Sequence, residues 1–305
     1  MTCHFFKAHD GARLAYRVDG EGQPLVALAG LSRDSRDFDY LVRHLDQCRV
    51  IRLDSRGRGE SEWTGPETYT VERESADVIA LLDHLGIDRA AILGSSRGGL
   101  IGLVLAATQR ARVAGLCLND VGPVIERAGL MRIGHYLGVT PAVDSLVEVM
   151  DRMPATMPGF DGVPPERWAE ETVRHFTEGP DGIGLTYDPA LRESFDKAMA
   201  GPLPELWDLF DACDGLPIAL IHGANSDVLS PGTANEMQRR RPDMIRVEIP
   251  DRGHIPFLDE PQALVGIRRW LRWIEAGAPP RGEPSQLPGR AGDIPLSHEG
   301  DQDVS

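Results

Sequence analysis

The feature that most constrains this chain is a tight turn between two apolar segments. Residues 90–93 read AAIL, residues 94–98 read GSSRG, and a second apolar run follows at 100–107. A strand that turns directly into a helix has no room for side chains at the two ends of the turn, so glycine is needed there. The central serine, Ser96, is then strained and exposed at the end of the sheet. The alternative is an ordinary N-cap serine.

Short apolar runs alternate with amphipathic segments along most of the chain. This alternation is typical of a parallel sheet with helices on both faces. The sequence therefore predicts an α/β fold with a mostly parallel central sheet flanked by helices. We expect strands at 13–18, 24–28, 49–53, 90–93, 113–118, 217–221 and 245–249, and helices at 36–45, 71–85, from the turn to about 108, 231–240 and 261–273.

The alternation stops between 124 and 208, where proline and glycine separate helix-like pieces and no clean strand is found. One interpretation is an ordinary helical layer with its own small core. Another is a cap whose methionine and aromatic side chains roof an apolar pocket. We expect a core at 1–123 and 209–276, a helical cap at 124–208 inserted after the sixth strand, and a disordered tail at 277–305, where proline, glycine and charge dominate.

Composition narrows the possible partners. The chain has 32 Lys+Arg against 47 Asp+Glu, a net charge of −15, which argues against nucleic acid or an anionic membrane as a partner. Its four cysteines are scattered and form no metal-binding or disulfide pattern. Neither a signal peptide nor a segment of membrane-spanning length is visible. We expect a cytoplasmic protein that acts on a small molecule, and the sequence leaves its oligomeric state open.

Two further motifs follow later predicted strands: HGANSD at 222–227 and GHIP at 253–256. Because parallel strands end at one edge of a sheet, Ser96, Asp227 and His254 are expected to meet there. A serine elbow followed by Asp and then His resembles the α/β-hydrolase fold family. The Gly- and Arg-rich loop DSRGRGES at 54–61 adds to the resemblance, which spans roughly residues 4–273 and is least specific in the cap.

The resemblance implies a serine hydrolase that works through an acyl-enzyme. Ser96 would be the nucleophile, because a hydroxyl needs an adjacent base, and His254 would be that base. Asp227 would fix the imidazole tautomer. Asp120, which follows the strand at 113–118, is the alternative acid, because some family members carry the acid there. Ser95 is the other hydroxyl in the turn, but only Ser96 has glycine two residues away on both sides.

The resemblance also places an oxyanion hole at the backbone N–H groups of Leu31 and Arg97. The chain has Ala29-Gly30 where His-Gly is usual, so a hydrogen bond that normally braces this loop would be missing. The Arg97 side chain is unusual after the nucleophile. It would form a salt bridge or attract an anionic substrate.

Two other features are expected to be structural. The loop at 54–61 lacks the ending of a phosphate-binding loop and would brace the active edge. His222 would brace the loop that follows it. Nothing in the sequence indicates a metal or an organic cofactor.

Three functions fit these motifs. The first is hydrolysis of a small carboxylic ester or lactone. The second is hydrolysis of a C–C bond in a vinylogous diketone ring-fission product by the same triad. The third is a non-catalytic small-molecule receptor on the same fold. Epoxide hydrolases and haloalkane dehalogenases are disfavoured, because they require an aspartate where Ser96 stands.

Overall fold

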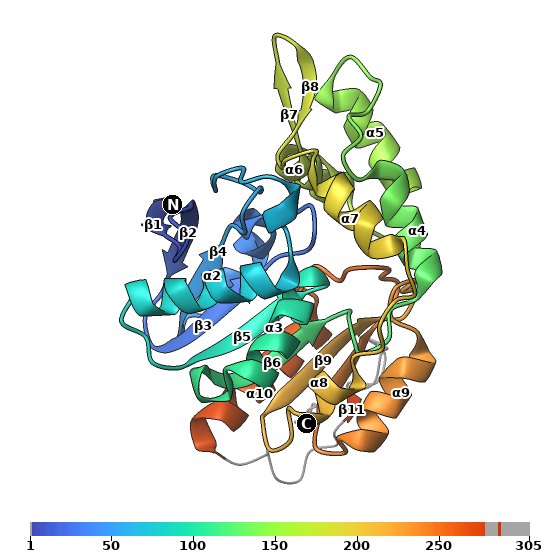
Figure 1. Ribbon diagram of the computed structural model, residues 1–305. Helices are drawn as coiled ribbons and strands as arrows, with labels where there is room; N and C mark the ends of the chain where they lie inside the picture. Colours follow the sequence, from blue (N-terminus) through green and yellow to red (C-terminus); the bar gives the residue numbers. More distant parts are fainter. Residues whose placement is uncertain (1, 278–285, 288–305) are drawn as a thin grey trace, which may run out of the picture.

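The computed structural model describes residues 2–277 and 286–287, and a nine-stranded sheet forms its centre (Figure 1). The first two pairings, β1 with β2 and β2 with β4, are antiparallel, and every later pairing is parallel. The predicted mostly parallel sheet is therefore confirmed. In spatial order the strands are β1 (His4–Lys7), β2 (Arg13–Asp19), β4 (Cys48–Leu53), β3 (Gln23–Leu28), β5 (Ala90–Ser95), β6 (Val113–Asn119), β9 (Ile218–Gly223), β10 (Ile245–Ile249) and β11 (Gln286–Leu287).

The central strands are apolar throughout because both of their faces are covered. In β3, Val26 and Leu28 belong to one buried cluster and Leu25 and Ala27 to another, as the two-residue period of a strand requires. The first cluster packs against helices α2 (Val71–His84), α3 (Arg97–Thr108), α8 (Trp207–Asp211) and α9 (Pro231–Arg240). The second packs against α1 (Asp39–Val42) and α10 (Pro261–Ala276).

Three short 3-10 turns accompany these helices: Ser35–Phe38, Pro66–Thr68 and Arg110–Arg112. The first of them divides the helix that the sequence predicted at 36–45, so that only α1 remains helical there.

Most of the segment between β6 and β9, from residue 127 to residue 199, forms a layer above the end of the sheet (Figure 1). Its members are α4 (Arg127–Tyr136), α5 (Leu146–Thr156), α6 (Pro165–His175), β7 (Phe176–Gly179), β8 (Gly182–Leu185) and α7 (Leu191–Met199). We call residues 127–199 the cap. It has a small core of its own, in which Val149, Met153, Trp168 and Ile183 are buried together.

Two details differ from the sequence prediction for this segment. The cap is not wholly helical, because β7 and β8 form an antiparallel hairpin. Their sequences, FTEG and GIGL, are short and rich in glycine, which obscures a strand pattern. In addition, Trp207 packs against the main core beside α3 rather than in the cap.

The predicted tail at 277–305 lies outside the described residues, apart from Gly277 and the two residues of β11, which pair with β10. Within the described part of the chain, no helix has the length and apolar composition needed to cross a membrane.

Candidate active site

The turn at Ser96 has the strained geometry that the sequence predicted. Ser96 lies between β5 and α3 with φ 49° and ψ −114°, a conformation that costs energy in a non-glycine residue. A Cβ atom at Gly94 would stand 2.3 Å from the carbonyl of Gly98, and one at Gly98 would stand 2.1 Å from the carbonyl oxygen of Leu28. Both glycines are therefore required by close backbone contact. The turn presents the Ser96 hydroxyl at the carboxyl edge of the sheet.

His254 lies beside this hydroxyl, in the loop that follows β10. Its Nε2 is 2.9 Å from Oγ of Ser96, and its Nδ1 is 2.8 Å from Oδ2 of Asp120. Because a carboxylate can only accept, Nδ1 carries the proton and Nε2 is free to accept from the serine hydroxyl. The side chains thus form a continuous chain of two hydrogen bonds.

Asp120 is fully buried and rigidly held at the end of β6. Its Oδ1 accepts from the backbone N–H of Gly223 at 2.8 Å, and its Oδ2 accepts from the Ser226 hydroxyl at 2.7 Å as well as from His254. Its φ of 57° turns the chain sharply after the strand, a conformation that aspartate tolerates better than most residues. An aspartate directly after a buried strand was the sequence signal for this position.

Asp227 does not contact His254, and this corrects the sequence prediction of the acid. Its carboxylate accepts two hydrogen bonds from Arg132 of α4, at 2.5 and 2.8 Å. Burial raises its pKa, but the hydrogen bonds and charge of Arg132, with a smaller contribution from His254, outweigh this and leave the pKa below its usual value. The expected residue is thus near the site, but its partner is in the cap.

The two predicted oxyanion donors belong to residues near Ser96. Arg97 is the first residue of α3, so its backbone N–H has no acceptor within the helix. Leu31 follows Gly30, and Gly30 lies close to Ser96, because a Cβ atom added to this glycine would stand 3.8 Å from Cβ of Ser96. Gly30 and Leu31 line the same pocket as Ser96.

A buried ion network holds both donor residues. Arg58 donates through Nε to the carbonyl oxygen of Leu31 at 2.8 Å and through Nη1 to Glu74 at 2.8 Å. Glu74, which is 1% exposed, also accepts from Arg97 at 2.7 and 3.0 Å. Burial raises the pKa of Glu74, but the charges of Arg58 and Arg97 outweigh it and hold the pKa below its usual value. The loop at 54–61 therefore supplies a brace for the Leu31 loop, and the Arg97 side chain is used for bracing.

His222 also has the structural role that the sequence predicted, because its Nε2 donates to the carbonyl oxygen of Leu229 at 2.9 Å. Cys117 is fully buried, and all four cysteines are free.

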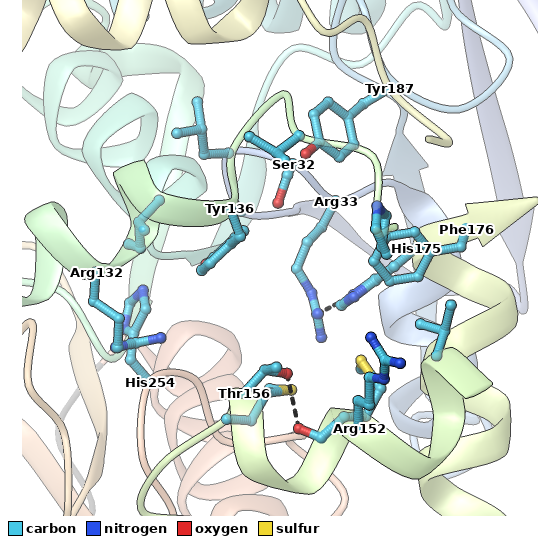
Figure 2. Close-up of a pocket in the computed structure, with 18 of the residues that line it drawn as sticks. Ser32, Arg33, Arg132, Tyr136, Arg152, Thr156, His175, Phe176, Tyr187 and His254 are labelled. Atoms are coloured by element: carbon cyan, nitrogen blue, oxygen red, sulfur yellow. Dashed lines mark hydrogen bonds between the residues drawn. The ribbon is translucent and has the colours of Figure 1, made fainter. Parts of the chain in front are cut away.

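A pocket of about 340 Å³ opens over Ser96 and His254, between the sheet edge and the cap. Much of its wall is apolar, including the cap residues Ile133, Val139 and Met153. Figure 2 shows Arg132 and His254 on one side of the pocket and His175 and Phe176 on the other, with Arg33 between them and contacting His175. The cap therefore roofs the pocket as well as having a core of its own.

At the far end of the pocket, Arg33 lies inside a group of possible metal ligands. Among the described residues, Asp37, Glu171 and His175 are close enough to hold a cation. Arg33 donates to both carboxylates and contacts Nε2 of His175, so a guanidinium already uses these ligand atoms. Burial and neighbouring arginines push the pKa of His175 well below its usual value, which suits an imidazole that accepts from Arg33.

The comparisons with known proteins identify the family and the fold. A sequence model described as "Alpha/beta hydrolase family" matches residues 25–267. The chain belongs to the alpha/beta hydrolase family. It is therefore a hydrolase in the broad sense, and it combines a strained serine turn between β5 and α3 with a cap inserted after β6.

The similar proteins include several hydrolases. This alpha/beta hydrolase is 36% identical to a 3-hydroxybutyrate-oligomer hydrolase of Cupriavidus necator, over 83% of this chain and 91% of that protein. It is 27% identical to an esterase of Mycobacterium tuberculosis, over 85% and 86% of the two chains. The crystal structure of an alpha/beta hydrolase from Novosphingobium aromaticivorans has a TM-score of 0.83 and 34% identity, covering 89% of this chain and 98% of that one.

Proposed function

We propose that this hydrolase cleaves small-molecule carboxylic esters, lactones included, through an acyl-enzyme on Ser96. The observation that supports this most directly is the hydrogen-bonded chain from Ser96 through His254 to Asp120, with both distances below 3 Å. An elbow serine, a neutral imidazole and a buried carboxylate in this order have the geometry of an activated nucleophile. Asp120 replaces Asp227 in the proposed triad.

The first half-reaction forms the acyl-enzyme. Ser96 Oγ attacks the ester carbonyl while its proton moves to Nε2 of His254. The negative charge that develops on the carbonyl oxygen is stabilised by the N–H groups of Arg97 and Leu31, and Asp120 stabilises the imidazolium. The bond to the alcohol oxygen then breaks, and His254 returns the proton to that oxygen.

The second half-reaction repeats these steps with water. His254 takes a proton from a water molecule, whose oxygen attacks the acyl carbon. Collapse of the second tetrahedral intermediate breaks the bond to Ser96 Oγ, which recovers its proton from His254. The products are a carboxylic acid and the free alcohol, and the enzyme returns to its starting state.

The substrates we favour among esters are short oligoesters of hydroxy acids. The relative that is 36% identical is named for the hydrolysis of 3-hydroxybutyrate oligomers. A pocket of about 340 Å³ is of a size suited to small-molecule ligands, and its mixture of apolar and cationic lining suits a substrate with short alkyl branches and a carboxylate.

A fluorophosphonate reagent and p-nitrophenyl butyrate test the proposal. We expect the reagent to label Ser96 in the wild type. We expect Ser96→Ala to abolish the labelling and to lower kcat by about 10⁵-fold or more. A folded Ser96→Ala variant with full esterase activity would contradict the proposal. Turnover of ring-fission products but not of esters would favour C–C hydrolysis, and ligand-dependent stabilisation without turnover of either would favour a receptor.

A further inference from the structure

The charges on the pocket wall differ from those of the whole chain. The chain carries a net charge of −15, yet the described residues that line the pocket include three arginines, Arg33, Arg132 and Arg152, and no aspartate or glutamate. The carboxylates that pair with these arginines lie outside the lining. A substrate in the pocket therefore meets cationic donors directly, which favours an anionic group.

Two of the three arginines are poor candidates for binding that group. Arg33 already donates to Asp37 and Glu171 and contacts His175, so its guanidinium is engaged on every side. Arg152 lies on α5 with 63% of its side chain exposed and pairs with Glu148 at 3.7 Å. An exposed cation of this kind attracts anions only weakly, because water and salt screen it.

Arg132 differs from both in its geometry. Asp227 accepts from Nε and Nη2 of Arg132, which holds the guanidinium in one orientation, and Nη1 takes no part in this pair. The side chain of Tyr136, which also lines the pocket, interacts with the same guanidinium. The side chain is 25% exposed and lines the pocket. A guanidinium has five donors in a fixed plane, so an acid bound at one edge leaves the others for a second carboxylate.

Arg132 also lies at the end of the pocket where the alcohol is released. Figure 2 shows Arg132 and His254 on the same side of the pocket, and Asp227, which accepts from Arg132, is close enough for His254 to lower the pKa of that carboxyl. In the mechanism above, the ester oxygen of the alcohol must reach Nε2 of His254 to be protonated. The alcohol portion therefore occupies the Arg132 end of the pocket.

We propose that Arg132 binds a carboxylate on the alcohol portion of the ester, so that the preferred substrates are esters of hydroxy acids. In a 3-hydroxy acid the carboxylate is one methylene away from the carbon that bears the ester oxygen, close enough to contact a cation beside His254. Arg132 thus selects the leaving group. In an oligoester, cleavage then releases the terminal hydroxy acid unit, the one that carries the free carboxylate. This proposal rests on the esterase function proposed above.

Two substrates that differ only in charge test the proposal: 3-(butanoyloxy)butanoate and its primary amide. We expect the wild type to prefer the carboxylate by about tenfold or more in kcat/KM, the gain from a hydrogen bond between charged groups. Arg132→Gln should bring this ratio close to one by raising KM for the carboxylate, with little change for the amide. Arg132→Lys should retain part of the preference, because it keeps the charge but loses the planar geometry.

Three further variants make the result specific. Arg127→Gln is the matched control, because Arg127 lies on the same helix and donates to the carbonyls of Met199 and Gly201 outside the pocket; the ratio should be unchanged. The double variant Arg132→Gln/Asp227→Asn should also lose the preference, which excludes repulsion by an unpaired Asp227 as the cause. Arg152→Gln should retain it.

The outcomes separate the two proposals. A preference that survives in a folded Arg132→Gln variant, or one that Arg152→Gln abolishes, would overturn the assignment of Arg132. A wild type that hydrolyses both substrates equally would overturn it as well. A wild type that hydrolyses neither substrate, nor p-nitrophenyl butyrate, would instead contradict the esterase function on which the assignment rests.

Discussion

Two neighbouring loops each carry an aspartate at the edge of the sheet, and their environments differ. Asp120 follows β6 and Asp227 follows β9, strands that pair directly with each other. Asp120 is fully buried and contacts His254, whereas the Asp227 side chain is 36% exposed and contacts Arg132 in the cap. Position at the edge of a parallel sheet brings a carboxylate near His254. The local turn and the available partners decide whether it contacts that histidine.

Among the carboxylate variants, the largest effect is expected for Asp120→Asn. An amide at this position can present its N–H₂ group to His254 and favour the wrong imidazole tautomer, so kcat for p-nitrophenyl butyrate should fall by about 10³- to 10⁴-fold. A loss of tenfold or less in a folded variant would remove the distinction between the two aspartates. Thermal unfolding of the variant provides the check on folding.

Glu74→Gln should lower kcat by an intermediate amount. The variant tests whether a carboxylate matters for kcat because it is buried or because it contacts His254. Glu74 is buried like Asp120 but pairs with arginines like Asp227. Loosening Arg58 and Arg97 should misplace the oxyanion donors and lower kcat by about 10- to 100-fold with little change in KM.

The matched control for this variant is Glu72→Gln, an exposed position on the same helix, for which we expect unchanged kinetics. Wild-type kcat in a folded Glu74→Gln variant would show that the network does not position the oxyanion donors.

Asp227→Asn should have a much smaller effect on the hydrolysis of the neutral p-nitrophenyl ester. The variant loses an ion pair that is partly exposed, worth about 1 kcal/mol or less, so kcat should change by no more than about fivefold. A loss comparable to that of Asp120→Asn would restore Asp227 as the functional acid and break the comparison.

The smallest expected effect is on the pH dependence of stability. Arg132 holds the pKa of Asp227 below the usual value of 3.8, so the folded state binds the proton less readily than the unfolded chain does. The pair therefore adds to the free energy of unfolding above pH 3.8, and this stabilisation is lost as the pH falls through the lower pKa of the folded state. Its size stays below about 1 kcal/mol, because the pair is partly exposed.

Urea unfolding of wild type and Asp227→Asn, from neutral pH to about pH 3, measures this contribution. The difference in free energy of unfolding between the two proteins should shrink toward low pH. A difference that grows as the pH falls would mean that Asp227 is protonated more readily when folded, contrary to its pairing with Arg132.

Much of the core could be predicted from the sequence, because its signals are local. The glycines around Ser96 are dictated by backbone contacts within a few residues, and apolar runs mark strands that are covered on both faces. The position of the loop that carries His254 could be predicted because it follows a parallel strand and therefore lies at the same edge of the sheet as Ser96. Which of Asp120 and Asp227 contacts His254 could not be predicted in this way, because both follow parallel strands and the sequence does not report side-chain direction.

The cap was less predictable for the same physical reason. The hairpin of β7 and β8 has little strand propensity and is held by its packing against α5 and α6, where Ile183 is buried with Val149 and Trp168. The brace from Arg58 to Leu31 joins residues 27 positions apart, and the pairing of Arg132 with Asp227 joins residues 95 positions apart. No local pattern records contacts of this length.

The position of Arg33 has a mechanical consequence. It stands two residues after Leu31, on the loop of one proposed oxyanion donor, and it contacts Glu171 and His175 of α6. The side chain of Arg33 therefore links the cap to this loop. A movement of α6 away from the sheet would have to break these contacts or carry the loop with it, so that in the proposed mechanism an opening of the cap would also affect the oxyanion donor.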